Sequence, residues 1–353
     1  MLKKVPYLNG LVWLVILFVI PLPLIQTLAL GLPTIYSSEA LAIQFGSIAY
    51  VWFLAAIYLS TRPRWLDRLI GLPSVYFIHG MLSMFAIGLA YLHKTETSSG
   101  GLIKQTGDWA FDLFLGLMLY SLIFMAGWLT SRIPLLDQLK HRLEVIFHHE
   151  LSVWLHRLNL IAVALVFLHV QLISYVTSIT SFMIFFDGYT ILVLAAYLIH
   201  KATHVWGLPA ATLVDKRELA PNFFEFRLQL RRPDQVTIKP GDYVFVNFPN
   251  VDHLKELHPF SVVNAVTETG EIVLAIRGDG DFSRLVQSLP LGAKAAVEGG
   301  FGRFAAVLKE QNNRLTTWCS LLAVLALFPC CRSSRPIPIK KSRCITQHTQ
   351  SKS

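Results

Sequence analysis

Hydrophobic residues occur in six long runs along the chain, at about 8–30, 40–60, 73–93, 109–129, 153–174 and 181–200. Each run has close to the roughly 20 residues that cross a bilayer as a helix. After residue 205 the pattern changes to an alternation of apolar and polar positions, which is typical of strands with one buried face. The sequence therefore predicts an all-α bundle of six membrane helices, followed by a small antiparallel β-barrel.

Lysine and arginine gather on one side of the predicted spans. Eight of them occupy the N-terminus and the loops 61–72 and 130–152, namely Lys3, Lys4, Arg62, Arg64, Arg68, Arg132, Lys140 and Arg142. The opposite loops hold only Lys94 and Lys104. Because basic loops stay in the cytoplasm, we expect a multi-pass protein of the cell (inner) membrane with both termini cytoplasmic. The first run lacks a small-residue cleavage site and contains Pro21 and Pro23, which predicts a retained, kinked helix.

Composition narrows the chemistry. The chain is 54% hydrophobic and 15% charged, with a net charge of +9. Since most of the short-loop charge lies at membrane boundaries, we expect contact with anionic lipid and no nucleic-acid partner. All four cysteines fall in the last 35 residues, so a redox centre in the body of the chain is not held by sulfur.

Two spans carry a pair of histidines each: the third has His79 and His93, and the fifth has His156 and His169. Fourteen residues along a helix correspond to about 21 Å and leave two side chains within about 40° of each other. The third and fifth spans run in the same direction, so His79 shares one level with His156, and His93 shares the other with His169. Two imidazoles at each level are the ligands of a low-spin haem, and we predict two b-type haems with these four residues as metal ligands.

Two other interpretations apply to intramembrane histidines. A single histidine more often pairs with a hydroxyl or a backbone carbonyl, and a proton relay usually brings Asp or Glu into the spans, which the third and fifth spans lack. The thirteen-residue spacing from His156 to His169 leaves an ideal helix about 140° out of phase, so the fifth span needs a tightened or widened turn. Arg157 is the expected partner of a haem propionate, because a guanidinium binds a carboxylate through two hydrogen bonds.

Strands are predicted at 223–230, 241–249 and 271–278, with "HPFSVV" between the second and third and "GDGDFSRLVQSLP" after the third. With the six spans and histidine pairs, these motifs resemble the NADPH oxidase and ferric reductase family over nearly all of residues 5–317. The family motif H-P-F-[ST] is matched by His258, Pro259, Phe260 and Ser261. A basic residue followed by G-D-[FWY]-[ST] is matched by Arg277, Gly280, Asp281, Phe282 and Ser283. The G-P-[FY]-G turn is matched by "GGFG" at 299–302, where Gly300 replaces proline and is expected to loosen the turn.

The resemblance implies an FAD-binding, ferredoxin-reductase-type barrel. In it, Ser261 offers a hydroxyl to the flavin N5 edge, Phe260 packs beside the ring, and Pro259 fixes the turn that presents them. Arg277 offsets pyrophosphate charge, and the amides that open the helix at Ser283 form an anion site.

The implied function is electron transfer from cytoplasmic NAD(P)H through FAD and two b-type haems to an external acceptor. We expect a bacterial ferric reductase that acts on a ferric or cupric chelate, and we leave open a superoxide-generating oxidase with dioxygen as acceptor. An interpretation of another class is a non-catalytic haem subunit that receives electrons from a partner. The sequence leaves the oligomeric state open.

The family continues with an NAD(P)H-binding α/β domain that opens with a Gly-rich turn. Here 36 residues follow Thr317, rich in Cys, Ser, Arg and Lys and without periodicity. Synonymous codons for 321–329 allow the shifted reading A-G-G-I-G-I-I-P, so we interpret the tail as out of frame, from a natural frameshift or a sequencing error. The expected domains are 1–204 (haem-binding spans), 205–310 (FAD-binding barrel) and 311–353 (an aberrant tail in place of the NAD(P)H domain). A chain truncated in this way is expected to lack its own hydride-donor site.

Overall fold

The fold is taken from a computed structural model that describes residues 4–124, 149–239, 241–264, 266 and 269–304. All of these belong to one compact unit, Met1–Val307. Residues 130–148 of the predicted loop 130–152 and the predicted tail 311–353 lie outside the described residues, and residues 149–152 begin a helix.

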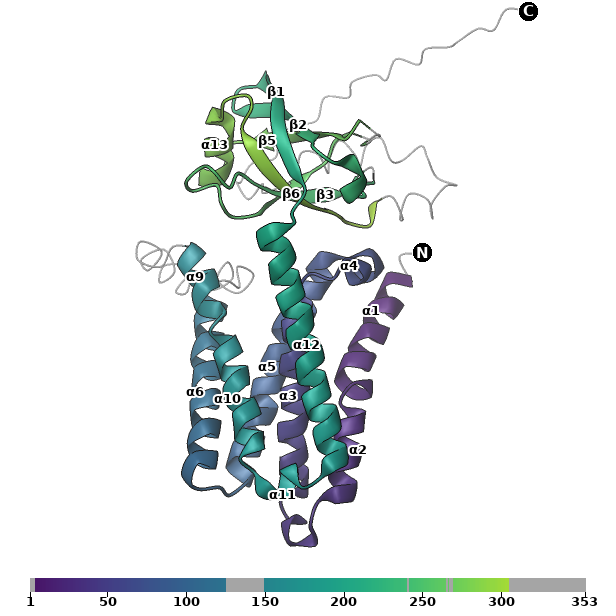
Figure 1. Cartoon of the computed structure of the whole chain (residues 1–353), viewed down its shortest axis with the longest axis vertical. Coiled ribbons are helices and arrows are strands. Elements are labelled where there is room, and N and C mark those ends of the chain that lie inside the picture. The colour runs from purple at the N-terminus through teal and green to yellow at the C-terminus, as the bar shows by residue number, and fades with distance from the viewer. Residues whose placement is uncertain (1–3, 125–148, 240, 265, 267–268, 305–353) are drawn as a thin grey trace, which may run out of the picture. The chain divides into compact units, whose positions relative to one another are not determined.

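Among the described residues, six helices are long and apolar enough to cross a membrane, as the hydrophobic pattern predicted. The first span consists of α1 (Lys4–Leu14), a π-helical turn at Val15–Val19 and α2 (Leu22–Gly31). The next three are α3 (Ala40–Ser60), α5 (Leu72–Glu96) and α6 (Gly101–Phe124); the fifth joins α9 (His149–His156) to α10 (Asn159–Gln171), and the sixth is α12 (Thr180–Trp206) (Figure 1). Short helices α4 (Arg64–Ile70) and α11 (Ser174–Thr177) lie in the connections.

Two span boundaries bear on the predictions. The first span is interrupted where Pro21 begins the second helical segment, because proline lacks the N–H that continues a helix. This agrees with the predicted kink. The fourth span begins at Gly101, eight residues before the predicted start at 109, since its first turns contain Lys104 and Asp108, which lower the hydropathy without breaking the helix.

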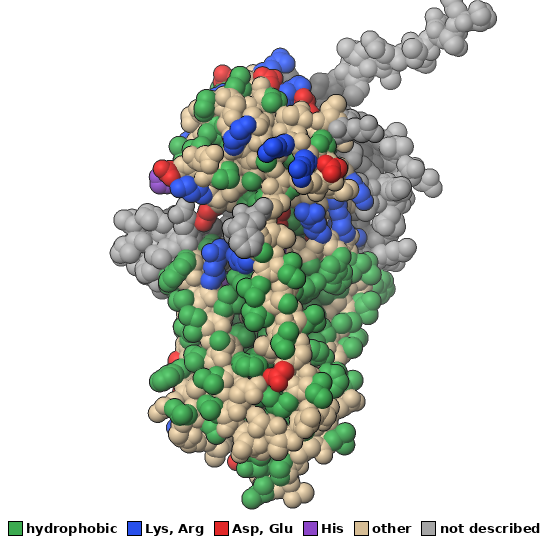
Figure 2. All heavy atoms as spheres, in the orientation of Figure 1, with side chains coloured by type: hydrophobic (Ala, Val, Ile, Leu, Met, Phe, Trp, Pro, Cys, Tyr) green, Lys and Arg blue, Asp and Glu red, His purple; other side chains and the backbone are tan. Residues whose placement is uncertain are grey.

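The surface of the helices is apolar on the face shown in Figure 2, whereas Lys and Arg gather on the strands and at one end of the helices. Inside the bundle, α3 packs against α5 and α6 packs against α10. Their contact surfaces form a buried core that includes Tyr50, Phe53, Phe114 and Ala162. This pairing of helices matters for the site, because α5 and α10 carry histidines and α3 and α6 are their neighbours.

The part after α12 is a six-stranded antiparallel sheet in the order β4-β3-β6-β1-β2-β5. The strands are β1 (Ala210–Ala220), β2 (Phe223–Leu230), β3 (Tyr243–Asn247), β4 (His258–Ser261), β5 (Glu271–Arg277) and β6 (Lys294–Phe301), with α13 (Asp281–Ser288) after β5. Among the described residues, the edge strands β4 and β5 form no ladder, and an isolated bridge joins Val262, just after β4, to Leu274 on β5. The sheet is therefore curled but not closed, which corrects the predicted barrel in this detail, because one bridge does not make a ladder.

Candidate functional site

The four histidines of the third and fifth spans lie in two pairs. The ring centroids of His79 and His156 are 5.9 Å apart, and those of His93 and His169 are 6.2 Å apart. Two imidazoles that bind one metal ion from opposite sides hold their centroids about 6 Å apart, because each metal–nitrogen bond is about 2 Å long. Each pair therefore has the spacing of a two-histidine metal centre. Among the described residues, no group of three or more His, Cys, Asp and Glu forms a larger ligand set.

Hydrogen bonds orient three of the four rings. The Nδ1 atom of His79 donates to the carbonyl oxygen of Ala56 (2.8 Å). His93 donates in the same way to Ala42 (2.9 Å), and His169 to Ile103 (2.8 Å). A carbonyl only accepts, so Nδ1 carries the hydrogen and Nε2 keeps its lone pair free for a metal. The fourth ring differs, because His156 Nδ1 lies 3.0 Å from the hydroxyl of Ser121.

Two glycines that no sequence motif marked leave space beside His93 and His169, called here the outer pair. A Cβ on Gly46 would lie 2.9 Å from His93 Nδ1, and one on Gly107 would lie 3.2 Å from the His169 ring. Each glycine is four residues after the carbonyl that accepts from the same histidine, at Ala42 or Ile103. The available signal was a glycine inside a hydrophobic helix, which usually marks close packing.

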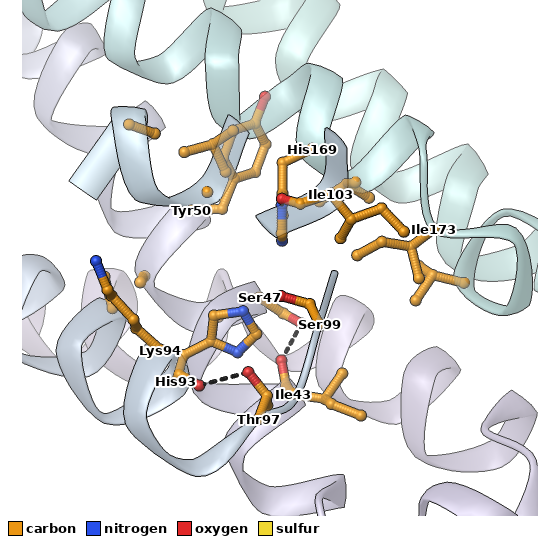
Figure 3. Close-up of a pocket in the computed structure, with 18 of the residues that line it drawn as sticks. Ile43, Ser47, Tyr50, His93, Lys94, Thr97, Ser99, Ile103, His169 and Ile173 are labelled. Atoms are coloured by element: carbon orange, nitrogen blue, oxygen red, sulfur yellow. Dashed lines mark hydrogen bonds between the residues drawn. The ribbon is translucent and has the colours of Figure 1, made fainter. Parts of the chain in front are cut away.

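A cavity of about 740 Å³ separates His93 from His169, and the two rings face each other across it (Figure 3). Apolar side chains of α3, α6 and α10 line most of it, together with Ser47, Tyr50 and Thr97. Lys94 also lines it and pairs with Asp108 at 2.9 Å. The volume lies within the range of about 300–1,000 Å³ that is usual for cofactor sites. The donor set and the space fit a haem at this level.

The thirteen-residue spacing is explained by a break in the fifth span. Helix α9 ends at His156 and α10 begins at Asn159. The connecting turn is tight, because the N–H of Leu160 bonds to the carbonyl of Arg157 at 3.0 Å, three residues back. Each residue in such a turn rotates by roughly 120° instead of 100°, which brings His169 toward the face that carries His156. Arg157, the predicted propionate partner, lies exposed in this turn.

The two predicted flavin motifs meet in space. The ring of His258 on β4 stacks on that of Phe282 on α13, with centroids 3.8 Å apart, and Phe260 lies 6.0 Å from the same ring. Pro259 and Ser261 alternate with these residues along the edge strand and are exposed. The Ser261 hydroxyl is therefore accessible at a sheet edge, as the flavin hypothesis requires.

The predicted anion site is organised by hydrogen bonds of its own. Gly280 caps α13, and its N–H donates to the hydroxyl of Ser283 at 3.0 Å. Arg277 lies 2.7 Å from the carboxylate of Asp279, and Asp281 pairs with Arg284 at 2.6 Å. The motif therefore contains a cation, Arg277, close in the chain to the capped start of α13. The hydroxyl of Ser283 is used in that cap.

Arg68 binds the "GGFG" turn, and the expectation that Gly300 loosens this turn stays a prediction. Arg68 donates to both carboxylate oxygens of Asp242 (2.8 and 2.7 Å) and to the carbonyls of Gly300 (2.8 Å) and Gly302 (2.6 Å). A Cβ on Gly300 would lie 2.5 Å from Asp242 Oδ2. The absence of a side chain therefore makes room for the carboxylate that binds Arg68.

A second buried ion pair lies close by. Glu298 Oε2 is 2.8 Å from the guanidinium of Arg62 and 3.1 Å from His204 Nε2. Burial favours the neutral carboxyl, but the hydrogen bond with His204 and the charge of Arg62 outweigh it, so the pKa of Glu298 lies below its ordinary value. Glu298 is therefore a charged group whose partners lie in α12 and in the loop before α4.

Comparisons with known proteins give matches over part of the chain. Residues 222–317 match the family described as FAD-binding domain. The chain is 29% identical over 108 residues to the phenol hydroxylase P5 protein of Acinetobacter pittii, covering 30% of this chain and 29% of that protein. It is 31% identical over 98 residues to ferric/cupric reductase transmembrane component 2 of Saccharomyces cerevisiae, covering 26% of this chain and 14% of that protein. Ferric reductase transmembrane component 3 of the same yeast matches with the same identity and coverage.

Solved structures were also similar over parts of the chain. A ferredoxin reductase in carbazole 1,9a-dioxygenase shares 20% identity with a TM-score of 0.24, over 27% of this chain and 28% of that one. A flavohemoglobin from Malassezia yamatoensis with bound FAD and heme shares 14% identity with a TM-score of 0.27, over 82% of this chain and 65% of that one.

Proposed function

Since this chain belongs to a ferric-reductase-like family with an FAD-binding domain, we propose that it is a transmembrane oxidoreductase that carries electrons from NAD(P)H, through FAD and two b-type haems, to an external acceptor. The six apolar helices make it a multi-pass membrane protein. We propose that the protein lies in the inner membrane with both termini in the cytoplasm. Arg62, Arg64 and Arg68 lie in one loop on the side of the predicted termini, and basic loops stay in the cytoplasm.

The observation that carries the haem proposal is the spacing of the paired rings, 5.9 Å at one level and 6.2 Å at the other. His79 and His156 hold the inner group, and His93 and His169 hold the outer one. The bound groups supply the electron chemistry, because FAD accepts two electrons and haem iron accepts one. The backbone carbonyls fix three of the rings in the tautomer that leaves Nε2 available.

Aromatic side chains fill the bundle between the two levels. Phe53 of α3 and Phe114 of α6 stack with centroids 3.9 Å apart and planes at 6°. Both are buried, and each lies in its helix between the residues that serve the outer and the inner histidines. This stacked pair forms an apolar layer between the two histidine levels.

On the sheet, His258, Pro259, Phe260 and Ser261 form the edge at which FAD is proposed to bind. Arg277 gives the charge that a pyrophosphate needs, and the first amides of α13, which begins at Asp281 after Gly280, give hydrogen-bond donors. Ser283 stabilises this helix start through its cap, so its contribution is to position the donors.

The acceptor is proposed to be a ferric or cupric chelate. The support is the function named for two relatives, "Ferric/cupric reductase transmembrane component 2" and "Ferric reductase transmembrane component 3" of yeast. Dioxygen is the other acceptor to test. A reconstituted preparation that reduces a ferric chelate, measured by a colorimetric Fe(II) reagent, supports the proposal; electron flow that appears only as superoxide assigns dioxygen instead.

The haem proposal is tested first by visible spectroscopy of the chain purified in mild detergent. We expect a b-type signal in the dithionite-reduced minus oxidised spectrum. The single variants His79→Leu and His169→Leu should each lose about half of this signal, since each substitution removes one of the two ligands of one of the two low-spin haems. Dithionite makes the test independent of the nicotinamide donor. A folded wild-type protein without this signal would overturn the proposal.

Flavin content separates the enzyme from a non-catalytic haem subunit. The same preparation is denatured, and the released flavin is measured by fluorescence. We expect FAD to co-purify or to rebind on addition. Haem in the absence of any FAD binding assigns the chain to the subunit class, in which a partner provides the electrons.

A further inference from the structure

The hydrogen bonds to the histidines repeat along the neighbouring helices. On α3, Ala42 accepts from His93 and Ala56 accepts from His79, and these two carbonyls are fourteen residues apart. On α6, Ile103 accepts from His169 at the outer level. The position fourteen residues further along α6 is Leu117. Because fourteen residues return a helix to nearly the same face, the carbonyl of Leu117 is the acceptor that the repeat predicts for His156.

The structure departs from this repeat at one residue. His156 Nδ1 lies 3.0 Å from the hydroxyl of Ser121, four residues after Leu117. At the outer level the matching position, four residues after Ile103, is Gly107, where a Cβ would lie only 3.2 Å from the His169 ring. A side chain at this place on α6 therefore meets the imidazole directly. At the inner level, Ser121 places a hydroxyl beside the ring of His156. At the outer level, Gly107 has no side chain, and the ring of His169 meets the backbone of α6.

The two acceptors differ chemically. An amide carbonyl accepts strongly from Nδ1–H and increases the electron density of the imidazole, which raises its basicity as a ligand. A serine hydroxyl is a weaker acceptor and also carries a hydrogen of its own. An imidazole with less electron density stabilises reduced iron relative to oxidised iron, and second-sphere hydrogen bonding is one of the means by which proteins tune haem potentials.

We propose that Ser121 is a positioning residue for His156 that sets the inner haem apart from the outer one, by giving it a higher midpoint potential than a carbonyl acceptor would. This inference rests on the proposed function, since it concerns ligands of a haem. Both outer histidines donate to carbonyls, whereas the inner pair has one carbonyl and one hydroxyl. In the acceptors of their ring hydrogen bonds, the outer and inner sites therefore differ at one residue, Ser121 of α6.

A second serine near the inner level provides a matched control. The hydroxyl of Ser83 donates to the carbonyl oxygen of His79 at 2.8 Å, within its own helix α5. It contacts the backbone of a predicted ligand but no imidazole nitrogen. Replacing Ser83 by alanine removes a hydroxyl at the same depth of the bundle without changing a ring hydrogen bond.

The test measures the midpoint potential of the inner signal, identified as the one that His79→Leu abolishes, by following the visible spectrum at controlled potentials. We expect Ser121→Ala to raise the potential, because Nδ1–H loses its acceptor. Ser121→Gly should lower it, because the Leu117 carbonyl becomes the acceptor, as Ile103 is at the outer level. Ser121→Thr keeps the hydroxyl and should restore the wild-type value, and Ser83→Ala should leave it unchanged.

Opposite shifts for alanine and glycine, with threonine restoring the potential, support the inference. It is overturned if the alanine and glycine variants keep the wild-type potential, if Ser83→Ala shifts the potential as they do, or if the threonine variant does not have the wild-type potential. Absence of haem from the wild-type protein is a separate result, which removes the proposed function itself.

Discussion

The side-chain amide of Asn159 donates a hydrogen bond to the main-chain carbonyl oxygen of His156, over 2.7 Å. The fifth span changes from α9 to α10 between these two residues. The helix break leaves the carbonyl of His156 without an ordinary helical partner, and Asn159 supplies one. A predicted metal ligand is thus held in place by the residue that starts the next helix.

Asn159→Leu therefore should reduce the inner haem signal and leave the outer signal. The substitution keeps the side-chain size but removes the donor, and an unpaired buried carbonyl costs about 1–3 kcal/mol. The reduced minus oxidised spectrum measures the outcome. Asn247→Leu is the control, because Asn247 at the end of β3 makes the same amide-to-carbonyl bond of 2.7 Å, to Lys255 in the loop between β3 and β4. Equal spectra for both variants would show that the break does not position His156.

Alanine at Gly46 is expected to abolish most of the outer haem signal, since the added methyl group would lie 2.9 Å from His93 Nδ1. Gly107→Ala should lower it less, because at 3.2 Å the His169 ring needs to move by only a few tenths of an ångström. Haem content per protein is the measurement. Gly88→Ala on α5 and Gly116→Ala on α6 serve as controls, because nothing lies within 4 Å of their added methyl groups. A similar loss in the controls would assign the effect to helix packing in general.

Replacing Arg277 by alanine should weaken FAD binding by roughly ten- to a hundredfold, the range expected for loss of a charge-assisted hydrogen bond worth about 1.5–3 kcal/mol. Titration of the deflavinated protein with FAD, followed by flavin fluorescence, measures the dissociation constant. Arg284→Ala is the matched control. Like Arg277, Arg284 pairs with a carboxylate, which is that of Asp281, and both Arg284 and Asp281 lie on α13. If both variants bind FAD with equal affinity, Arg277 has no special role.

The depressed pKa of Glu298 predicts a loss of stability in acid. A carboxyl with a folded-state pKa below its ordinary value of 4.5 stabilises the fold above that pH, and the contribution disappears as pH falls through the lower folded-state value. At neutral pH, Glu298→Gln should destabilise the protein by about 3 kcal/mol, because it leaves Arg62 buried without its partner. Thermal unfolding in detergent at neutral pH and below about pH 4 measures both effects.

The wild-type protein should lose more stability on acidification than the Glu298→Gln variant, which lacks the titrating group. Glu218→Gln, an exposed position on β1, is expected to keep the wild-type response. Parallel pH profiles for wild type and Glu298→Gln would contradict the assignment of the ion pair to fold stability.

The strands illustrate where sequence patterns suffice. Strand β2 spans the predicted residues 223–230, where apolar and polar residues alternate, and β5 lies within the predicted 271–278, where the residues between Glu271 and Arg277 are all apolar. Residues of β4 were predicted only as part of the motif "HPFSVV", and strands β1 and β6 were missed. β1 contains the polar run Asp215 to Glu218 on an exposed stretch, and β6 is rich in alanine and glycine, so neither shows the usual alternation.

The sequence by itself determined the number of membrane helices, since a lipid interior demands about twenty apolar residues per span whatever their neighbours are. It also selected the four histidines and the two flavin motifs, because few side chains can do that chemistry. Domain boundaries and the tail stay predictions. The tertiary structure decided what holds each histidine: the carbonyls of Ala42, Ala56 and Ile103, the hydroxyl of Ser121 and the space beside Gly46. Every residue has a carbonyl, so only helix packing selects which one meets a ring.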